Sequence, residues 1–169
     1  MKKTGLLLLL TFISLNLFPQ IQRKFYDFHM GETTKNEVIS YFRVIGKEFQ
    51  FEENNTMRVS DMKFGGEEWP TVFFNFYNNR LYSISFINSE LKTSKNSLKT
   101  IYDRLKRKLD EKYSNYYNTQ SVEYFLGYTD DKTDVCLRYA KFEGVYMLII
   151  MYSDIELMLK EDDDGKDEL

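Results

Sequence analysis

The hydrophobic residues of this chain are spaced in two ways, as dense runs broken by short turn pairs and as positions that repeat at helical intervals. The first dense run, residues 71–87, is rich in aromatic and β-branched side chains on both sides of Asn78-Asn79. Asparagine tolerates the positive φ that a two-residue hairpin turn requires. Residues 134–152 repeat this design around Glu143-Gly144. Both runs therefore predict β-hairpins.

The alternation within the first hairpin predicts which of its side chains face the core. Six apolar residues at alternate positions are expected to share that face: Val72, Phe74, Phe76, Tyr82, Ile84 and Phe86. Residues 145–152 are apolar on both faces, which favours a central place in the sheet. Shorter strands are predicted at residues 49–53, 57–64 and 122–128, and Gly65-Gly66 is expected to interrupt the pairing of strands.

Two segments have the periodicity of amphipathic helices. Thr34 and Glu37 form a capping-box pattern at the start of residues 35–45, and Gly46 follows as a stop. The apolar positions of this first helix are Val38, Ile39, Phe42 and Ile45. The second helix, residues 94–113, places its apolar side chains on one face: Leu98, Ile101, Tyr102, Leu105, Leu109 and Tyr113. Each helix can therefore pack against a sheet.

The order of these elements indicates a weak internal repeat, a helix followed by a strand meander in each copy. Aligning the two hairpin turns pairs the following residues: Phe74 with Tyr139, Leu81 with Tyr146, Ile84 with Ile149, and Phe86 with Met151. The copies would span about residues 28–90 and 91–155, with their meanders in one sheet or in two abutting sheets. We therefore expect an α+β fold with both helices on one face of an antiparallel sheet.

The first residues read as an export signal. Lys2 and Lys3 precede an apolar run at residues 6–18, which is the arrangement of a secretory signal peptide. This run is shorter than the roughly 20 residues that a bilayer-spanning helix needs, so cleavage is the expected outcome. An uncleaved anchor is the alternative, because no small-x-small cleavage site follows the run. We expect residues 1–20 to be the signal, residues 21–160 one domain, and residues 161–169 an acidic tail of a periplasmic or cell-surface protein.

Composition narrows the class of protein. Of the 169 residues, 43% are hydrophobic and 17% aromatic, which excludes a disordered chain. The formal net charge is −3, and most of the acidic excess lies in residues 161–169, so no nucleic-acid-binding surface is expected.

One cationic surface stands out on the second helix. Its members are Lys95, Lys99, Arg104, Lys106, Arg107, Lys108 and Lys112. A basic helix face of this kind can contact an anionic membrane peripherally, or it can be an ordinary solvated face.

Few residues could carry chemistry. His29 is the only histidine and Cys136 the only cysteine, which leaves no multi-histidine zinc site, no thiolate zinc site and no internal disulfide. Gly65-Gly66 does not have the spacing of a phosphate-binding loop. We therefore expect no catalytic residues, no metal and no cofactor, and we do not expect an enzyme.

Two other functions are compatible with parts of the sequence. A secreted hydrolase could use the carboxylates of Asp61, Glu67 and Glu68 for general acid and base work. The ending Lys166-Asp167-Glu168-Leu169 has the form of an endoplasmic-reticulum retention signal, and in that compartment Asn54 would be a glycosylation acceptor.

A family resemblance rests on the motif Met30-Gly31 before the first helix, on Phe64-Gly65-Gly66 with Trp69 close behind, and on residues 72–77 and 81–84. In this order the chain resembles the β-lactamase-inhibitor-protein-like and SmpA/OmlA (BamE-like) group of small exported bacterial domains. The resemblance implies a non-catalytic α+β domain that binds another protein through its sheet or loops. The chain departs from the lipoprotein members in having no cysteine near its start to carry a lipid.

The function expected from the sequence is therefore an exported, non-catalytic module that binds another protein or a ligand. Aromatic side chains supply rigid contact area at little entropic cost. Trp69, Tyr77 and Tyr82 are the predicted partner-binding residues. The alternative for each of them is a place in the core.

Overall fold

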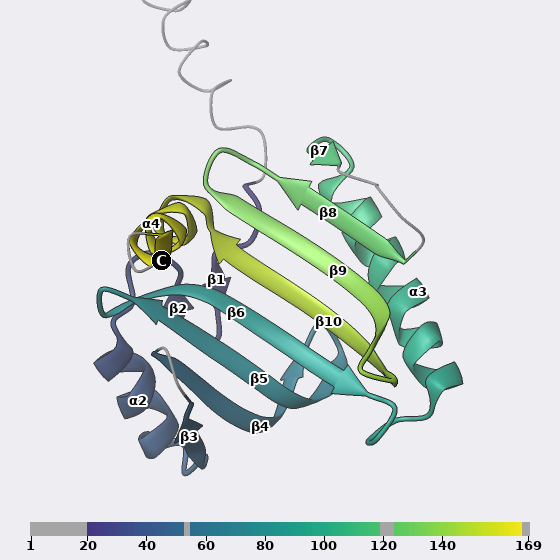
Figure 1. Cartoon of the computed structure of the whole chain (residues 1–169), viewed down its shortest axis with the longest axis horizontal. Coiled ribbons are helices and arrows are strands. Elements are labelled where there is room, and N and C mark those ends of the chain that lie inside the picture. Colours follow the sequence, from purple (N-terminus) through teal and green to yellow (C-terminus); the bar gives the residue numbers. More distant parts are fainter. Residues whose placement is uncertain (1–19, 53–54, 119–123, 167–169) are drawn as a thin grey trace, which may run out of the picture.

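A computed structural model describes residues 20–52, 55–118 and 124–166 of the chain (Figure 1). Within these residues the structure is α+β, and its main element is an eight-stranded antiparallel sheet. From one edge to the other the strands are β3 (Phe49–Phe51), β4 (Thr56–Phe64), β5 (Glu67–Tyr77), β6 (Arg80–Ser89), β10 (Val145–Asp154), β9 (Thr133–Phe142), β8 (Phe125–Thr129) and β7 (Tyr117–Asn118). The predicted fold class is confirmed.

The two halves of the chain meet along the ladder between β6 and β10. Helix α2 (Lys35–Val44) precedes β3 to β6, and helix α3 (Lys95–Tyr113) precedes β7 to β10. In the joining ladder Ile84 lies opposite Tyr152, and Phe86 lies opposite Ile150. The apolar strand β10 lies between β6 and β9, so the prediction of a central strand is confirmed.

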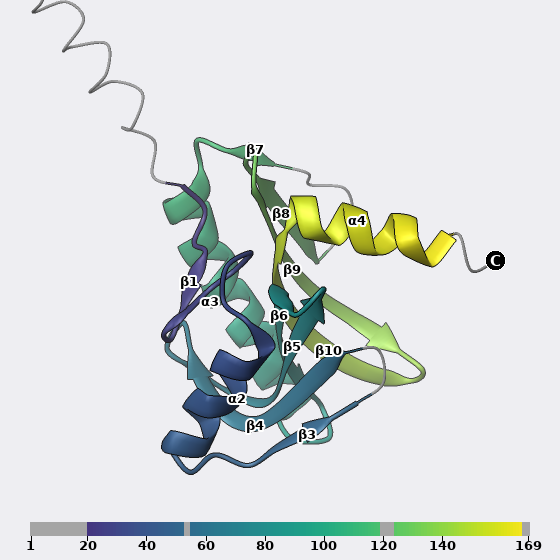
Figure 2. The same ribbon diagram turned by 90° about the vertical axis from the view of Figure 1, so that its left-hand side faces the viewer.

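The helices α2 and α3 lie on the same side of the sheet (Figure 2). A small hairpin, β1 (Lys24–Phe25) and β2 (Phe28–His29), lies on this side too. Their apolar side chains and one face of the sheet form the core, which includes Phe28, Phe42, Phe74, Phe86 and Leu98 at 2% exposure or less. We call this face of the sheet the inner face.

Local signals in the sequence set both helices. Thr34 and Glu37 make both hydrogen bonds of the capping box at the start of α2, as predicted. Ile45 was predicted on the apolar face of α2, but the helix ends at Val44 and Ile45 is 50% exposed. All six predicted apolar positions of α3 pack in or against the core.

Three hairpin turns depend on backbone with positive φ. The turns predicted at Asn78-Asn79 (φ 45° and 65°) and Glu143-Gly144 (φ 47° and 92°) are confirmed. Gly65 and Gly66, at φ 64° and 83°, form a third tight turn, across which Phe64 pairs with Glu67. The expectation that these glycines interrupt the sheet is therefore wrong, because they adopt the φ values of a two-residue hairpin turn.

A β-bulge changes the faces of β6. Asn75 pairs with Ser83, but Phe76 pairs with Leu81, so Tyr82 is the extra residue. Leu81 is fully buried in place of Tyr82, which is only half-buried. The prediction that Tyr82 shares the core face with Ile84 is wrong, because an extra residue in one strand reverses the alternation beyond it.

The bulge also affects the predicted repeat. Ile150 and Tyr152 are the cross-strand partners of Phe86 and Ile84, and all four are buried. Ile149 and Met151 therefore point to the opposite face. The alignment of the two turns paired Ile149 with Ile84 and Met151 with Phe86, so it pairs side chains on opposite faces of the sheet.

The predicted acidic tail is in large part a helix. Helix α4 (Ile155–Lys166) follows β10 without a loop and projects from the side of the sheet opposite to α2 and α3 (Figure 2). The Asp154 carboxylate accepts a hydrogen bond from the Leu157 N–H at 2.9 Å, which caps the start of the helix. The domain boundary expected at residue 160 therefore falls inside α4.

Several sequence predictions fall outside the described residues. They concern the signal segment at residues 1–19, the glycosylation acceptor Asn54, and the last three residues of the Lys-Asp-Glu-Leu ending. Among the described helices, none is both long enough and apolar enough to cross a bilayer.

Arg23 connects the start of the domain to α4. Its guanidinium donates to the Asp154 carboxylate, to the Lys132 carbonyl at 2.9 Å and to the Met30 carbonyl at 2.9 Å. The Asp154 side chain is only 9% exposed, so it depends on this cation for compensation.

Replacing Arg23 by Met should therefore lower the free energy of unfolding by about 3 kcal/mol, because it leaves the buried Asp154 carboxylate without its cation. The same change at Arg43, which is exposed near the end of α2, should cost less than about 0.5 kcal/mol. Urea denaturation measures both values. Equal effects of the two substitutions would contradict the role given to Arg23.

Candidate interaction surface

The face of the sheet opposite to the core, which we call the outer face, carries a largely apolar surface. Phe73, Ser85, Met151 and Cys136 are successive cross-strand partners on β5, β6, β10 and β9. A second row runs parallel to the first and consists of Ile87, Ile149, Arg138 and Phe125. Ser85 is 8% exposed, Arg138 is exposed, and the other six side chains are partly exposed. Neither α2 nor α3 covers this face (Figure 2).

Helix α4 stands on one end of the outer face, beside the hairpin that joins β5 to β6 (Figures 1 and 2). The Tyr82 hydroxyl donates to the Glu161 carboxylate at 2.9 Å, and the Tyr77 hydroxyl donates to the Asp164 carboxylate. Beneath the start of the helix, Ser83 and Ser153 are 2% exposed and their hydroxyl oxygens are 3.3 Å apart. The two tyrosines therefore hold an acidic helix of their own chain.

These contacts change the acidity of both tyrosines. Burial, together with the hydrogen bond to Glu161, raises the pKa of Tyr82 far above its ordinary value. The hydrogen bond to Asp164 raises the pKa of Tyr77 as well. Both hydroxyls therefore remain protonated donors at any physiological pH.

The three predicted partner-binding residues do not lie together. Tyr77 and Tyr82 meet at the base of α4 on the outer face, because the bulge turns Tyr82 away from the core. Trp69 is 1% exposed, and its indole N–H donates to the Phe64 carbonyl at 3.0 Å. Its ring centroid lies 5.8 Å from that of Phe86, in the core. Trp69 therefore offers no exposed ring to a partner in this structure.

The sequence contained a signal for the outer face. Strand β10 is apolar at every position from Val145 to Ile150, and only every second side chain can face the core. Leu148 and Ile150 are buried, whereas Met147, Ile149 and Met151 remain partly exposed. The apolar run therefore places side chains on both faces of the sheet, and α2 and α3 cover only the inner face.

Cys136 lies on the outer face opposite Met151. Burial raises the pKa of its thiol to about 11. A neutral thiol is a small apolar side chain and a poor nucleophile.

The carboxylates considered for a hydrolase are separated. Glu67 faces the helices, where both of its oxygens accept from Arg104 of α3 at 2.6 and 2.7 Å. Glu68, the next residue of the strand, points to the other face and pairs with Lys63 at 3.2 Å. Asp61 is exposed on β4 at a positive φ of 54°. These three acids do not form the convergent pair that acid–base hydrolysis needs. Among the described residues, no group of three potential metal ligands is found either.

Most cations of α3 have partners within the chain. Lys99 and Lys106 pair with Asp103 and Asp110 one turn away, at 2.8 and 2.7 Å. Arg104 pairs with Glu67, and Lys108 donates to the Gly65 carbonyl at 2.8 Å. This pattern favours the solvated face over the membrane-contacting face among the two interpretations of this helix.

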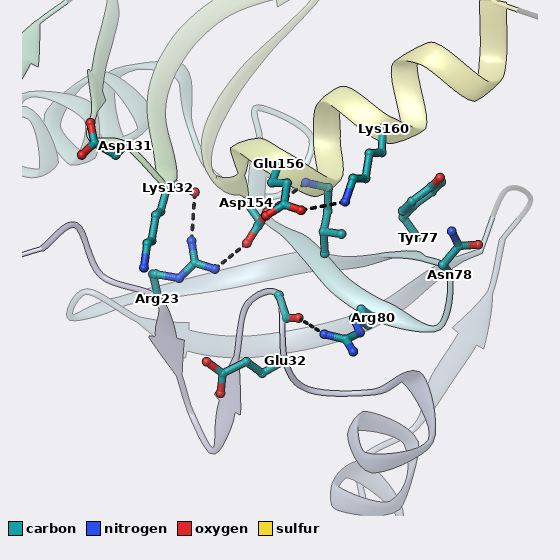
Figure 3. A pocket seen from close by; sticks show the side chains of 12 residues that line it. Arg23, Glu32, Tyr77, Asn78, Arg80, Asp131, Lys132, Asp154, Glu156 and Lys160 are labelled. Carbon is teal, nitrogen blue, oxygen red and sulfur yellow. Dashed lines mark hydrogen bonds and ion pairs between the residues drawn. The ribbon is translucent and has the colours of Figure 1, made fainter.

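A hollow of about 540 Å³ lies between the first turns of α4 and the turn at Asn78 (Figure 3). Several of its charged side chains have partners within the chain. Lys160 pairs with Glu156 at 2.6 Å, and Arg80 donates to the Gly31 carbonyl at 3.1 Å. We interpret the hollow as part of the junction that fixes α4 to the domain.

The placement of Trp69 in the core predicts a stability effect. Trp69→Ala should lower the free energy of unfolding by about 3–5 kcal/mol, the range found for large aromatic side chains removed from a core. Tyr77→Phe removes one hydroxyl from a partly exposed side chain and should cost less than about 1 kcal/mol. Chemical denaturation of both variants tests the assignment, and a Trp69→Ala variant as stable as Tyr77→Phe would contradict it.

The raised pKa of Cys136 predicts slow alkylation. Below its pKa a thiol loses a factor of ten in thiolate for each pH unit, and this pKa is about 11 in place of 9.0. Iodoacetamide at neutral pH should therefore react roughly a hundredfold more slowly with the folded chain than with the chain unfolded in urea. The rate for the folded chain should continue to rise above pH 9. Equal rates in both states would show that the fold does not raise the pKa of this thiol.

The sequence and the structure were compared with known proteins. No family model, no curated protein and no solved structure matches this chain. Its function must therefore be inferred from its own residues and their geometry.

Proposed function

We propose that this chain is an exported, non-catalytic module that binds another protein through the outer face of its sheet. The observation that carries the proposal is the pair of neighbouring rows of partly exposed apolar side chains on that face, with Phe73 and Met151 in one row and Ile87 and Ile149 in the other. Contiguous apolar surface of this kind on a folded domain is typical of an interaction site.

The arrangement of layers supports this choice of surface. The inner face of the sheet is covered by two helices and a small hairpin, whereas the outer face carries α4 at one end only (Figure 2). A sheet also holds its side chains on a rigid backbone, so little conformational entropy is lost when a partner binds. A partner can rest on β5, β6, β10 and β9 and against the side of α4.

The charge of α4 indicates what kind of partner fits. Glu161, Asp162, Asp163 and Asp164 follow one another on the helix that borders the apolar surface. Complementary charges steer association and penalise wrong partners. We therefore propose a protein partner whose apolar patch is bordered by lysine or arginine side chains.

Export and the internal repeat belong to the same proposal. Lys2, Lys3 and the apolar residues 6–18 support export to the periplasm or cell surface. Each half of the chain supplies a helix followed by four strands, and this order supports the repeat. The resemblance to the β-lactamase-inhibitor-protein-like and BamE-like domains, which also implies protein binding, is part of the proposal.

Site-specific photo-crosslinking in cells of the source organism tests the proposed surface. A photoreactive amino acid is placed at Phe73 or Ile149 on the outer face and, as a control, at Lys99 or Arg107 on the exposed side of α3. An adduct of one defined mass is expected from both outer positions and from neither helix position.

The crosslinked partner should carry a basic border around its contact site, identified by mass spectrometry of the adduct. Adducts confined to the positions on α3, or no adduct from either outer position of a folded chain, would refute the proposal.

A further inference from the structure

A rim of three lysines surrounds the place where the described chain begins. A hollow of about 560 Å³ is lined there by Gln20, Gln22, Lys24, Lys112 and Lys132, among others. The lysines come from β1, from the end of α3 and from the turn before β9, and all three are exposed. We call Lys24, Lys112 and Lys132 the lysine rim.

The chain is fixed at this place from its first described residues onward. Ile21 is 1% exposed, and its N–H donates to the Asp130 carboxylate at 2.9 Å. The Gln22 N–H donates to the Tyr113 hydroxyl at 3.2 Å, and Lys112 donates to the Gln22 side chain at 3.0 Å. The lysine rim therefore has a set position relative to Ile21 and Gln22.

The charge at the rim is positive. Among the ion pairs between described residues, none involves Lys24, Lys112 or Lys132. Glu32 is the one acidic residue in the lining, and Arg23, the fourth cation there, is neutralised by Asp154.

Two further acids lie in the turn before β9. The Asp130 carboxylate is directed inward, where it accepts from the N–H groups of Ile21, Lys132 and Thr133. Asp131 is exposed and lines the neighbouring hollow beside α4.

The apolar residues 6–18 precede the lysine rim closely in the sequence. Only Pro19 and Gln20 separate the apolar residues 6–18 from the buried Ile21. Three residues of extended chain span about 10 Å. If the apolar segment stays in a membrane, the lysine rim therefore lies within about one Debye length of the lipid headgroups.

We infer that the end of the domain bearing the lysine rim rests on an anionic phospholipid surface. The inference rests on the export proposed above, in the alternative in which residues 6–18 remain as an uncleaved anchor. It differs from a membrane contact along α3, because Lys99, Arg104 and Lys106 of that helix are in ion pairs. The rim combines Lys112, at the end of α3, with two lysines of other elements, and the ion pairs between described residues include none of the three. A domain seated in this way holds its first residues at the membrane and leaves the outer face of the sheet free.

Vesicle co-sedimentation tests the inference with the chain that begins at Gln20. This chain contains every strand and helix that the structure describes, together with the core, and a thermal melt confirms folding before the assay. The probes are phosphatidylcholine vesicles with and without phosphatidylglycerol. Binding to the anionic vesicles alone is expected, and it should weaken as salt is added.

The variant with Lys24→Glu, Lys112→Glu and Lys132→Glu tests the rim itself. Each lysine near an anionic surface contributes about a fivefold gain in partitioning, and glutamate adds repulsion to the loss of that gain, so this variant should bind at least about a hundredfold less. The control carries the same substitutions at Lys63, Lys92 and Lys141, which are exposed elsewhere on the domain, and should bind like the original chain. An equal loss in both variants, or no binding of the folded original chain, would overturn the inference.

Inorganic phosphate separates a lipid surface from a small-anion site. Phosphate and chloride at equal ionic strength should release the chain from vesicles to the same extent, because a surface contact is screened without being occupied. Release by phosphate far beyond chloride would assign the rim to a free anion and overturn the inference. Either result leaves the crosslinks at Phe73 and Ile149 unaffected, so this inference and the proposed function fail separately.

Discussion

The antiparallel ladder between β6 and β10 is the interaction on which the rest of the structure depends. It is the only pairing in the described sheet that joins a strand of the first half to a strand of the second. Without it each half would be a four-stranded sheet with an exposed edge, which is a site for unwanted pairing. Its register also assigns the faces, since Phe86 and Ile150 point to the core, whereas Ile87 and Ile149 point outward as partners. The apolar surface proposed for a partner is therefore a consequence of the same ladder that closes the core.

One extra residue in β6, next to the end of this ladder, affects both the core and the outer face. The bulge at Tyr82 places Leu81 in the core and turns the tyrosine toward α4, where it donates to Glu161. Tyr77 makes the second contact, to Asp164. Because α4 continues directly from β10 and is capped by Asp154, which Arg23 holds, the acidic helix borders the outer face in a defined position. Arg23 also lines the hollow at the lysine rim, so one side chain lies beside the rim and binds the residue that caps α4.

Much of the fold could be predicted from the sequence because its signals are local. The capping box at Thr34, the hairpin turn at Asn78-Asn79 and the period of α3 each depend on a few neighbouring residues. The features that the sequence did not indicate depend on distant contacts. The bulge at Tyr82 is an extra residue in the pairing of β5 with β6, and the acidic helix α4 is held by tyrosines on those two strands. Trp69 looked like a partner anchor because its burial depends on the turn at Gly65-Gly66, which extends β5 backward to Glu67. The one signal in the sequence for an apolar outer face was the apolar run of β10.

The most direct test of the account is whether the outer face is open to solvent in the free chain. Methyl relaxation by a soluble paramagnetic agent, read by NMR on isoleucine methyl groups, compares neighbours that should lie on opposite faces. Ile84 and Ile150 are at most 1% exposed, whereas Ile87 and Ile149 are partly exposed on the outer face. The account predicts strong relaxation of the Ile87 and Ile149 methyl groups and weak relaxation of the other two. Equal protection of all four would show that the outer face is covered, and would contradict its role as a free interaction surface.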